Sequence, residues 1–396
     1  MEFSLHRDEI SCLSAESARC TMRHVVEVEA DSEEDELARL ELDEWIALAA
    51  SQVEDAATAD DVEAVEATLP LLRRCVVRSA ALNGAGHLAA LEQRVALAGA
   101  LETANRSAEA ADQLRTCVDE SLALDAVEAA SNYRFHLASI LNDAGDAAAA
   151  AAELQRCLAS REAILGETHD ETLTTLVFLA EVTQCAAESC AVDSAEAAET
   201  MVKAEALMRR ALALHESSRG EDDPETQACM SNLAGFLQDA GKLEEAEVLM
   251  RRDLAVTEHA LGGVEHEDAV MSLSNLADVL LARGSETLRA EAEVLMQRCL
   301  AAAVVVHGAD DAVSIYARGN VGRCRVRTVG DRAAVAEAAA MIAEACRELR
   351  APPHYFRDDH RWLLKLDAAR VEGALRERVC IACAAPRESD TAALVQ

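Results

Sequence analysis

The residues best suited to metal binding lie close together near the end of the chain. Cys380 and Cys383 form a Cys-x-x-Cys pair, and His354 and His360 precede it at irregular spacing. A tetrahedral zinc site needs four ligands, and no second Cys or His pair follows. The spacing therefore favours two ordinary cysteines over half of a zinc site or a redox pair, and we expect no metal and no cofactor.

The sequence also lacks the motifs that mark a catalytic site. It contains no glycine-rich phosphate loop, no Gly-x-Ser-x-Gly and no His-Glu-x-x-His. Carboxylates are abundant, but abundance alone does not define an acid–base pair. We therefore predict that the chain is not an enzyme. Five histidines are expected near helix ends or in loops, as caps or surface residues: His136, His215, His259, His266 and His307.

Polar residues that could bind a partner recur at regular intervals instead. The sequence Asn-Leu-Ala begins at Asn232 and again at Asn275, and a degraded copy begins at Asn320. An asparagine side chain offers two donors and one acceptor, which suits the backbone of an extended peptide. The elements that carry these asparagines decide whether they share a surface.

The stretch 223–262 predicts two short amphipathic helices, 224–239 and 243–260, joined at Gly241. A helix pair of this size cannot bury its apolar faces alone. Taking Leu233 as the reference, similar pairs recur at positions 95, 137, 179, 276 and 321, with steps of 42, 42, 54, 43 and 45 residues. Val95-Ala96 is the faint first copy. Self-similarity at a fixed period predicts a solenoid of stacked helix pairs.

These residues resemble tetratricopeptide repeats of the kinesin light chain kind. The resemblance rests on Asn-Leu-Ala, a following glycine, and Glu-Ala-Glu-x-Leu-Met-Arg-Arg-x-Leu-Ala, within 125–330 and more weakly within 85–124. It implies an all-α fold, a right-handed superhelical solenoid of antiparallel helix pairs. It also implies that partners bind in a concave groove lined by the first helix of each pair.

In the register of this family, four positions of each first helix face the groove. They place Asn232, Asn275 and Asn320 in one row, with a basic end beyond them. Arginine forks suit carboxylates, and by resemblance such grooves hold peptides through asparagines and basic residues. The alternative is that asparagine is only the consensus of the repeat. The predicted partner-binding residues are Asn232, Asn275, Asn320, Tyr316, Arg323 and Arg327.

Composition agrees with a helical repeat protein that binds another protein. Only 3% of residues are aromatic, five are proline, and the net charge is −35. A field of this sign repels a phosphate backbone and an anionic membrane surface, so we expect neither nucleic acid nor membrane as a partner. No N-terminal apolar segment suggests secretion. The thirteen cysteines should therefore be reduced thiols of a cytoplasmic protein, with Cys117, Cys157 and Cys299 as small core residues and Cys185 and Cys190 exposed.

The expected organisation has five parts. Residues 1–35 form an acidic leader, which either solubilises the chain or binds a basic partner or the protein's own groove. Residues 36–84 form N-terminal helices, with Pro70 as a possible break. Residues 85–350 form the repeats, with an insertion near 185–199. Residues 351–384 form a capping helix with Trp362, Leu363, Leu366 and Val371 buried, and 385–396 form a tail.

The predicted function is a non-catalytic scaffold or adaptor that binds a peptide or protein in the concave groove. The alternative is a regulatory or interaction subunit of an enzyme or motor complex, such as a kinesin light chain-like cargo adaptor. A heptad coiled coil would favour that adaptor, and none precedes the repeats. The partner, the pathway and the oligomeric state do not follow from the sequence.

Overall fold

The computed structural model describes residues 33–58, 61–190, 194–261, 266–328, 332–351, 363 and 365–370. These residues form α-helices and their connections, with no β-strand among them. The all-α prediction is therefore confirmed. Residues 1–32 of the predicted acidic leader, the tail, the cysteines at 380 and 383 and most of the predicted capping helix lie outside the described residues, whereas 33–35 belong to the first described helix.

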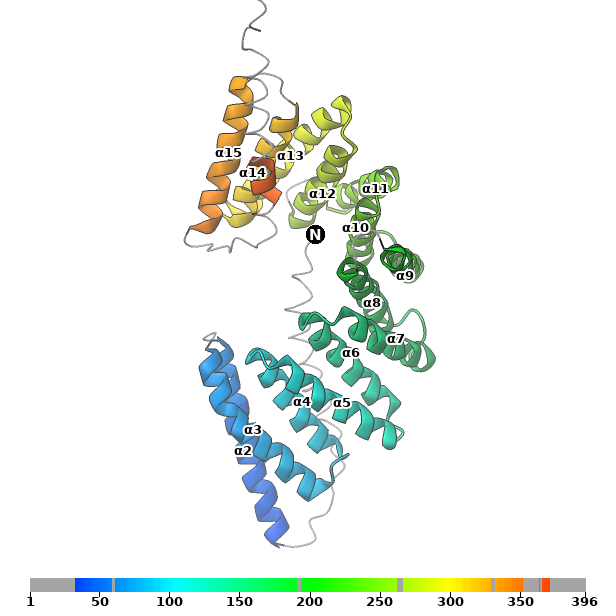
Figure 1. Cartoon of the computed structure of the whole chain (residues 1–396), viewed down its shortest axis with the longest axis vertical. Helices are drawn as coiled ribbons and strands as arrows, with labels where there is room; N and C mark the ends of the chain where they lie inside the picture. Colours follow the sequence, from blue (N-terminus) through cyan, green and yellow to red (C-terminus); the bar gives the residue numbers. More distant parts are fainter. Residues whose placement is uncertain are drawn as a thin grey trace, which may run out of the picture. The chain divides into compact units, whose positions relative to one another are not determined.

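The chain divides into two compact units, Glu2–Ser218 and Arg219–Gln396. In each unit, most helices that follow one another in the chain pack side by side (Figure 1). The N-terminal unit contains α2 (Glu33–Thr58), α3 (Val62–Asn83), α4 (Leu88–Thr103), α5 (Ser107–Ala123), α6 (Val127–Asp143), α7 (Ala147–Ile164), α8 (Asp170–Ser189) and nearly all of α9 (Ala195–Arg219). The C-terminal unit contains α10 (Pro224–Asp239), α11 (Leu243–Leu261), α12 (Glu267–Arg283), α13 (Glu286–His307), α14 (Ala312–Thr328), α15 (Arg332–Arg350) and a helical segment at 365–370.

Local sequence signals set most helix ends. Asp223 accepts hydrogen bonds from the backbone N–H groups of Glu225 and Thr226, and so begins α10. Gly241 and Gly284 have φ values of 74° and 75°, the left-handed conformation that follows many helices. These features explain why 224–239, predicted from spacing alone, is the observed extent of α10.

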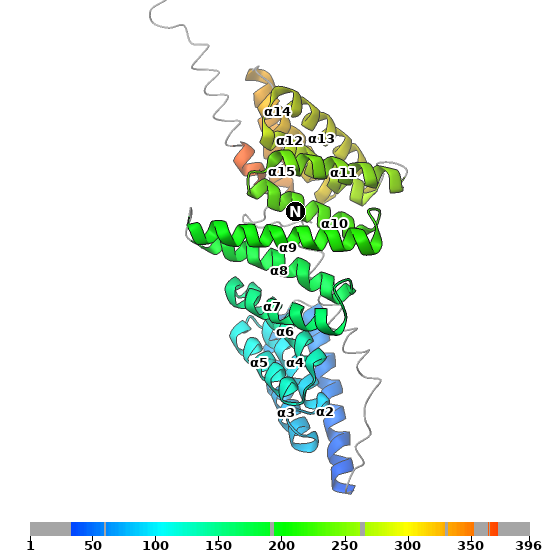
Figure 2. The same ribbon diagram turned by 90° about the vertical axis from the view of Figure 1, so that its right-hand side faces the viewer.

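Two helices are longer than the sequence predicted. The expected insertion near 185–199 is largely helical, because α8 continues to Ser189 and α9 begins at Ala195 (Figure 2). Alanine and glutamate dominate this stretch, and both favour helix. Pro70 does not break α3, which runs unbroken through it.

The repeat register of the N-terminal unit differs from the predicted one. Leu97 and Ala98 are buried in α4, whereas Val95 and Ala96 are not. The true step to Leu137-Ala138 is therefore 40 residues, not 42. Val95-Ala96 looked equivalent to Leu137-Ala138 because valine is apolar. In an alanine-rich helix, however, only burial shows which side faces the core.

The cysteines of the second helices are core residues, as predicted. Cys117, Cys157 and Cys299 are at most 2% exposed. Their thiols donate weak hydrogen bonds to backbone carbonyls of the preceding first helices, at Leu91, Ser131 and Val270. Burial raises the pKa of Cys117 to about 12, so this thiol is protonated and unreactive at neutral pH. Cys185 is exposed, as expected, and Cys190 is partly exposed.

Two histidine predictions were wrong. His136 lies in the middle of α6, where burial and then Arg161 lower its pKa. His215 lies within α9 and is 3% exposed. His266 begins α12 as a cap and accepts a hydrogen bond from the backbone N–H of Asp268.

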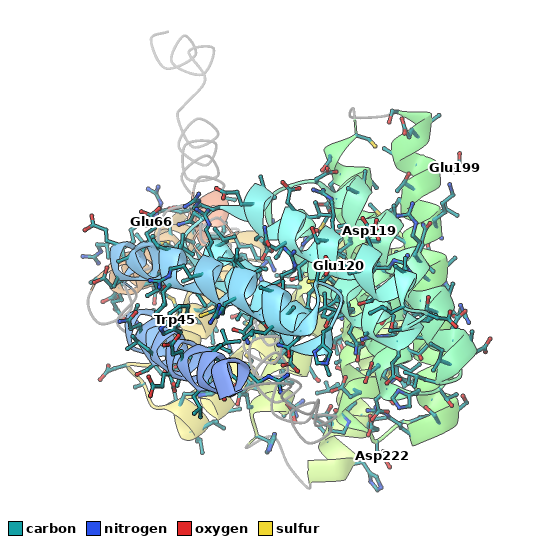
Figure 3. The ribbon with its side chains drawn as sticks, turned by 90° about the horizontal axis from the view of Figure 1, so that it is seen from below. Trp45, Glu66, Asp119, Glu120, Glu199 and Asp222 are labelled. Carbon is teal, nitrogen blue, oxygen red and sulfur yellow. The ribbon has the colours of Figure 1, made fainter. Side chains whose placement is uncertain are left out.

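The first two helices are joined by an aromatic contact. The guanidinium of Arg74 on α3 lies over the ring of Trp45 on α2, 4.3 Å from its centroid (Figure 3). Such cation–π contacts stabilise neighbouring helices. The buried residues of α3 also follow the register of α5, since Leu72 and Cys75 correspond to Leu114 and Cys117. The array of helix pairs thus includes residues that were predicted only to precede or cap it.

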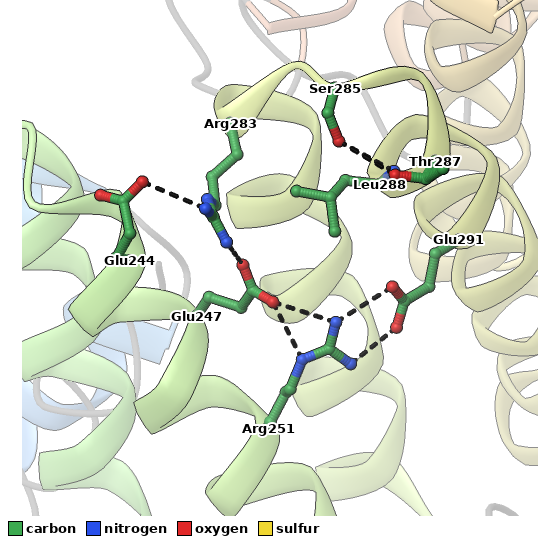
Figure 4. A network of polar contacts seen from close by, with 8 residues as sticks. All are labelled: Glu244, Glu247, Arg251, Arg283, Ser285, Thr287, Leu288 and Glu291. Carbon is green, nitrogen blue, oxygen red and sulfur yellow. Dashed lines mark hydrogen bonds and ion pairs between the residues drawn. The ribbon is translucent and has the colours of Figure 1, made fainter.

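Ion pairs connect successive helices along the C-terminal unit (Figure 4). Glu247 of α11 pairs with Arg283 of α12 and with Arg251 of its own helix. Arg251 then reaches α13, where its two Nη atoms lie 2.6 and 3.0 Å from the carboxylate of Glu291. Burial opposes ionisation of Glu247, but hydrogen bonds from Arg283 and Arg251 keep its pKa below the usual value.

Replacing Glu247 with Gln should lower the melting temperature at low salt, because it leaves Arg251 and Arg283 with fewer anionic partners. The loss should shrink at about 1 M NaCl, where the Debye length is roughly 3 Å. Differential scanning calorimetry at the two salt concentrations measures this. Gln297→Ala, an exposed change on α13, is the control, and a salt-independent loss would contradict the electrostatic account.

None of the helices in the described part of the chain is long and apolar enough to cross a membrane.

Candidate functional site

Three first helices of the C-terminal unit carry asparagine at equivalent positions. Asn232, Asn275 and Asn320 each precede a core residue of their helix, Leu233, Leu276 and Val321. The matching starts of the helices hold this register, since α10 and α12 begin at side-chain caps and Asp311 accepts a hydrogen bond from the N–H of Val313 before α14.

The three asparagines differ in exposure. Asn232 and Asn275 are partly exposed, whereas Asn320 is fully buried. The Nδ2 atom of Asn275 is inaccessible to solvent and has no hydrogen-bond partner among the described residues. An unpaired buried donor costs about 1–3 kcal/mol.

A cluster of charges lies next to this row. The carboxylate of Asp278 on α12 pairs with the guanidinium of Arg323 on α14. Its second oxygen lies 3.1 Å from Nζ of Lys365. Arg323 also donates from Nε to Oδ1 of Asn320, at 3.0 Å. The side chains of Asp278 and Arg323 are 14% and 10% exposed, so water screens their attraction only weakly.

The two cations decide the charge state of Asp278. Burial would raise its pKa, but Arg323 and Lys365 outweigh burial and lower the pKa to about 2. The pKa of Lys365 is raised, chiefly by Asp278. A carboxylate held in this way is a poor base, so the cluster is suited to joining helices and not to proton transfer.

The segment that contributes Lys365 packs closely against α14. Leu363 and Leu366 are fully buried, and the capping role of this segment stays a prediction. Gly319 makes this approach possible, because a Cβ atom there would lie 2.8 Å from Cδ1 of Leu366. Lys365 follows Asn320 by 45 residues, the same interval that separates Asn320 from Asn275. This interval was the signal by which the sequence could have identified Lys365 as the next member of the row.

The structure therefore divides the six predicted site residues into two groups. Asn232, Asn275 and Arg327 are partly exposed. Tyr316, Asn320 and Arg323 are buried, at 9%, 0% and 8% exposure. The predicted basic end of the groove therefore has fewer exposed arginines than expected, because Arg323 pairs with Asp278 inside the unit. Peptide binding by the six residues stays a prediction.

The N-terminal unit has a buried arginine between helix pairs. Arg161 of α7 donates to Oδ1 of Asn132 on α6 and to Oγ1 of Thr175 on α8, both at 2.7 Å. It also donates to the backbone oxygen of Glu171 at 3.0 Å, and its guanidinium lies 5.1 Å from the ring centroid of Phe135. Because Arg161 is 6% exposed, these contacts fix the positions of α6 and α8 on either side of α7.

Comparison with known families identifies the repeat unit. The tetratricopeptide repeat model matches residues 136–171 and 226–268. These two segments are similar to tetratricopeptide repeats, in agreement with the resemblance predicted from spacing. No curated protein matches the whole sequence significantly.

Solved structures show similar helical architecture. One holds nearly identical repeats assigned to a kinesin light chain of Podosopora anserina, with 21% identity, a TM-score of 0.44, and coverage of 53% of this chain and 94% of that one. Another is BtubC (BKLC) from P. vanneervenii, with 20% identity, a TM-score of 0.46, and coverage of 67% and 92%. A Rap protein complexed with competence and sporulation factor has 12% identity, a TM-score of 0.41, and coverage of 87% and 99%.

Proposed function

We propose that this chain is a non-catalytic interaction scaffold that binds an extended peptide segment along the first helices of its C-terminal unit. The observation that supports the proposal most directly is the partly exposed pair Asn232 and Asn275 at equivalent positions of successive first helices. The tetratricopeptide repeat at 226–268 includes the first of the two.

The proposed mode of binding follows from these positions. Side-chain amides on neighbouring helices can pair with the backbone of a peptide that crosses them, which supplies affinity that depends little on ligand sequence. Met271 and Asp239, on the same helices, would select ligand side chains. Arg323 is excluded from direct contact in this scheme because it lies inside the unit. The proposed location remains cytoplasmic, in keeping with nine free cysteines among the described residues.

The test is panning of a phage-displayed library of random peptides on the full chain. Peptides that bind should lose affinity about 10- to 100-fold with Asn232→Ala/Asn275→Ala, since each lost hydrogen bond is worth roughly 0.5–1.5 kcal/mol. Fluorescence polarisation measures the affinity and circular dichroism checks folding. The control is Gln297→Ala, which removes an exposed amide from a second helix. Equal affinity of the asparagine variant and the wild type would contradict this site.

The same face would bind the partner if the chain were instead a regulatory subunit of an enzyme or of a motor complex, such as a kinesin light chain-like adaptor. The peptide measurement therefore tests the binding surface under both proposals.

A further inference from the structure

A buried aspartate stands in the core of the C-terminal unit, at a position where other second helices carry a small, uncharged residue. Asp253 of α11 is 1% exposed. By the register of buried residues it corresponds to the following positions in the other second helices: Cys75, Cys117, Cys157, Ala211, Cys299 and Ala345. A carboxyl group at this position needs a specific explanation, because burying a charge without a partner is costly.

Hydroxyl groups surround the Asp253 side chain. Ser272 Oγ on α12 donates to Asp253 Oδ2 at 2.7 Å. Ser231 on α10 is a further hydrogen-bonding neighbour of this carboxyl group. Thr257, one turn further along α11, lies 3.3 Å from Ser272 Oγ and 3.4 Å from the side-chain oxygen of Gln227 on α10. The network thus joins α10, α11 and α12 through one acidic group.

No cation balances that group among the described residues. The groups that face it from α10 and from its own helix are uncharged, and from α12 the carboxylate of Asp268 acts on it by repulsion. Burial raises the pKa of Asp253 to about 6, and the repulsion adds to the shift while Ser272 and Ser231 oppose it. Asp278, only one helix away, shows the opposite shift because Arg323 and Lys365 neutralise it.

We propose that Asp253 is a proton-operated switch between helices. When its carboxyl group takes up a proton from solvent, α11 packs tightly between α10 and α12. When the group gives up that proton, the uncompensated charge loosens the packing of the three helices. This inference concerns regulation of the unit and does not depend on the proposed peptide site.

The direction of the pH dependence follows from linkage. The folded-state pKa of Asp253 lies above its ordinary value of 3.8. Its contribution to stability is therefore complete below that value and is lost as the pH rises through about 6. For a shift of this size, the folding equilibrium constant of the wild type should fall roughly 50-fold, relative to a variant that does not titrate, between about pH 4 and 7.5.

The experiment compares urea denaturation of the full chain across this pH range by circular dichroism. Asp253→Asn removes the titration and keeps a hydrogen-bonding side chain of the same shape. Asp253→Cys installs the residue that four other second helices carry, and serves if the asparagine variant folds poorly. Asp222→Asn is the matched control, because Asp222 is an exposed aspartate of the same unit (Figure 3).

We expect both Asp253 variants to gain stability relative to the wild type as the pH rises, whereas Asp222→Asn follows the wild-type curve. Parallel curves for the wild type and the Asp253 variants would overturn the proposal. Ser272→Ala tests the network itself: it removes a donor to the ionised form, so the midpoint of the transition should move to higher pH. An unmoved midpoint would show that the hydroxyl network does not set the switch.

Discussion

Replacing Asp278 with Ala is expected to destabilise the C-terminal unit by about 3–5 kcal/mol, because it leaves a buried arginine without its counter-charge. Arg323 is 8% exposed, and its remaining side-chain hydrogen bond is to Asn320, which is neutral. The same change releases Lys365 and so weakens the attachment of the C-terminal segment to α12. Urea denaturation of the full chain at neutral pH measures the loss.

A second variant distinguishes loss of a charge partner from loss of packing. Asp278→Leu/Arg323→Met removes both charges and restores apolar contact, and it should recover most of the stability, since paired buried charges are often replaceable by apolar residues. Failure of the double variant to recover stability would show that the Asp278 side chain acts mainly through its shape. Asp222→Asn, an exposed change in the same unit, should be neutral.

The acid limb of the stability curve gives a further check on Asp278. Its folded-state pKa, about 2, lies below the ordinary value of 3.8. Its contribution to stability is therefore present above that value and lost as the pH falls toward about 2. Asp278 and Asp253 thus act in opposite directions, one favouring neutral pH over strong acid and the other favouring mild acid over neutral pH.

In the N-terminal unit, Arg161→Met should cost about 3 kcal/mol. Methionine keeps most of the apolar volume but removes the donor to the side-chain oxygen of Asn132 and the ion pair with the carboxylate of Glu171. Each buried polar group that loses its partner costs roughly 1–3 kcal/mol. Because the side chain connects α6, α7 and α8, hydrogen exchange should also accelerate in all three helices.

The control is Arg156→Met, a little more than one turn earlier on α7. Arg156 pairs with Glu153 but is 60% exposed, so its removal should change stability by less than about 0.5 kcal/mol. Equal losses for the two variants, measured by thermal unfolding of the full chain, would mean that burial of the Arg161 network is not what stabilises the unit.

The sequence determined the elements of this protein because their signals are local. Apolar spacing and capping residues belong to stretches of about twenty residues, and they predicted the helix 224–239, which the structure shows unchanged. The repeat period also required only comparison of the chain with itself. This comparison assigned the wrong register at Val95, because the alanine-rich helix there has two apolar faces and the sequence does not show which one is buried.

The environment of each polar side chain was decided by tertiary structure alone. Arg323 appeared to be a groove residue, yet Asp278 lies 45 positions before it and Lys365 lies 42 after it, and only packing brings the three charges together. Asp253 shares its register position with four buried cysteines, but the hydroxyl groups around its carboxyl group come from two neighbouring helices. Helix periodicity specifies which face a residue occupies. The pKa of its side chain and the accessibility of that side chain to a ligand depend on neighbours from other helices. No local sequence pattern encodes the distances to those neighbours.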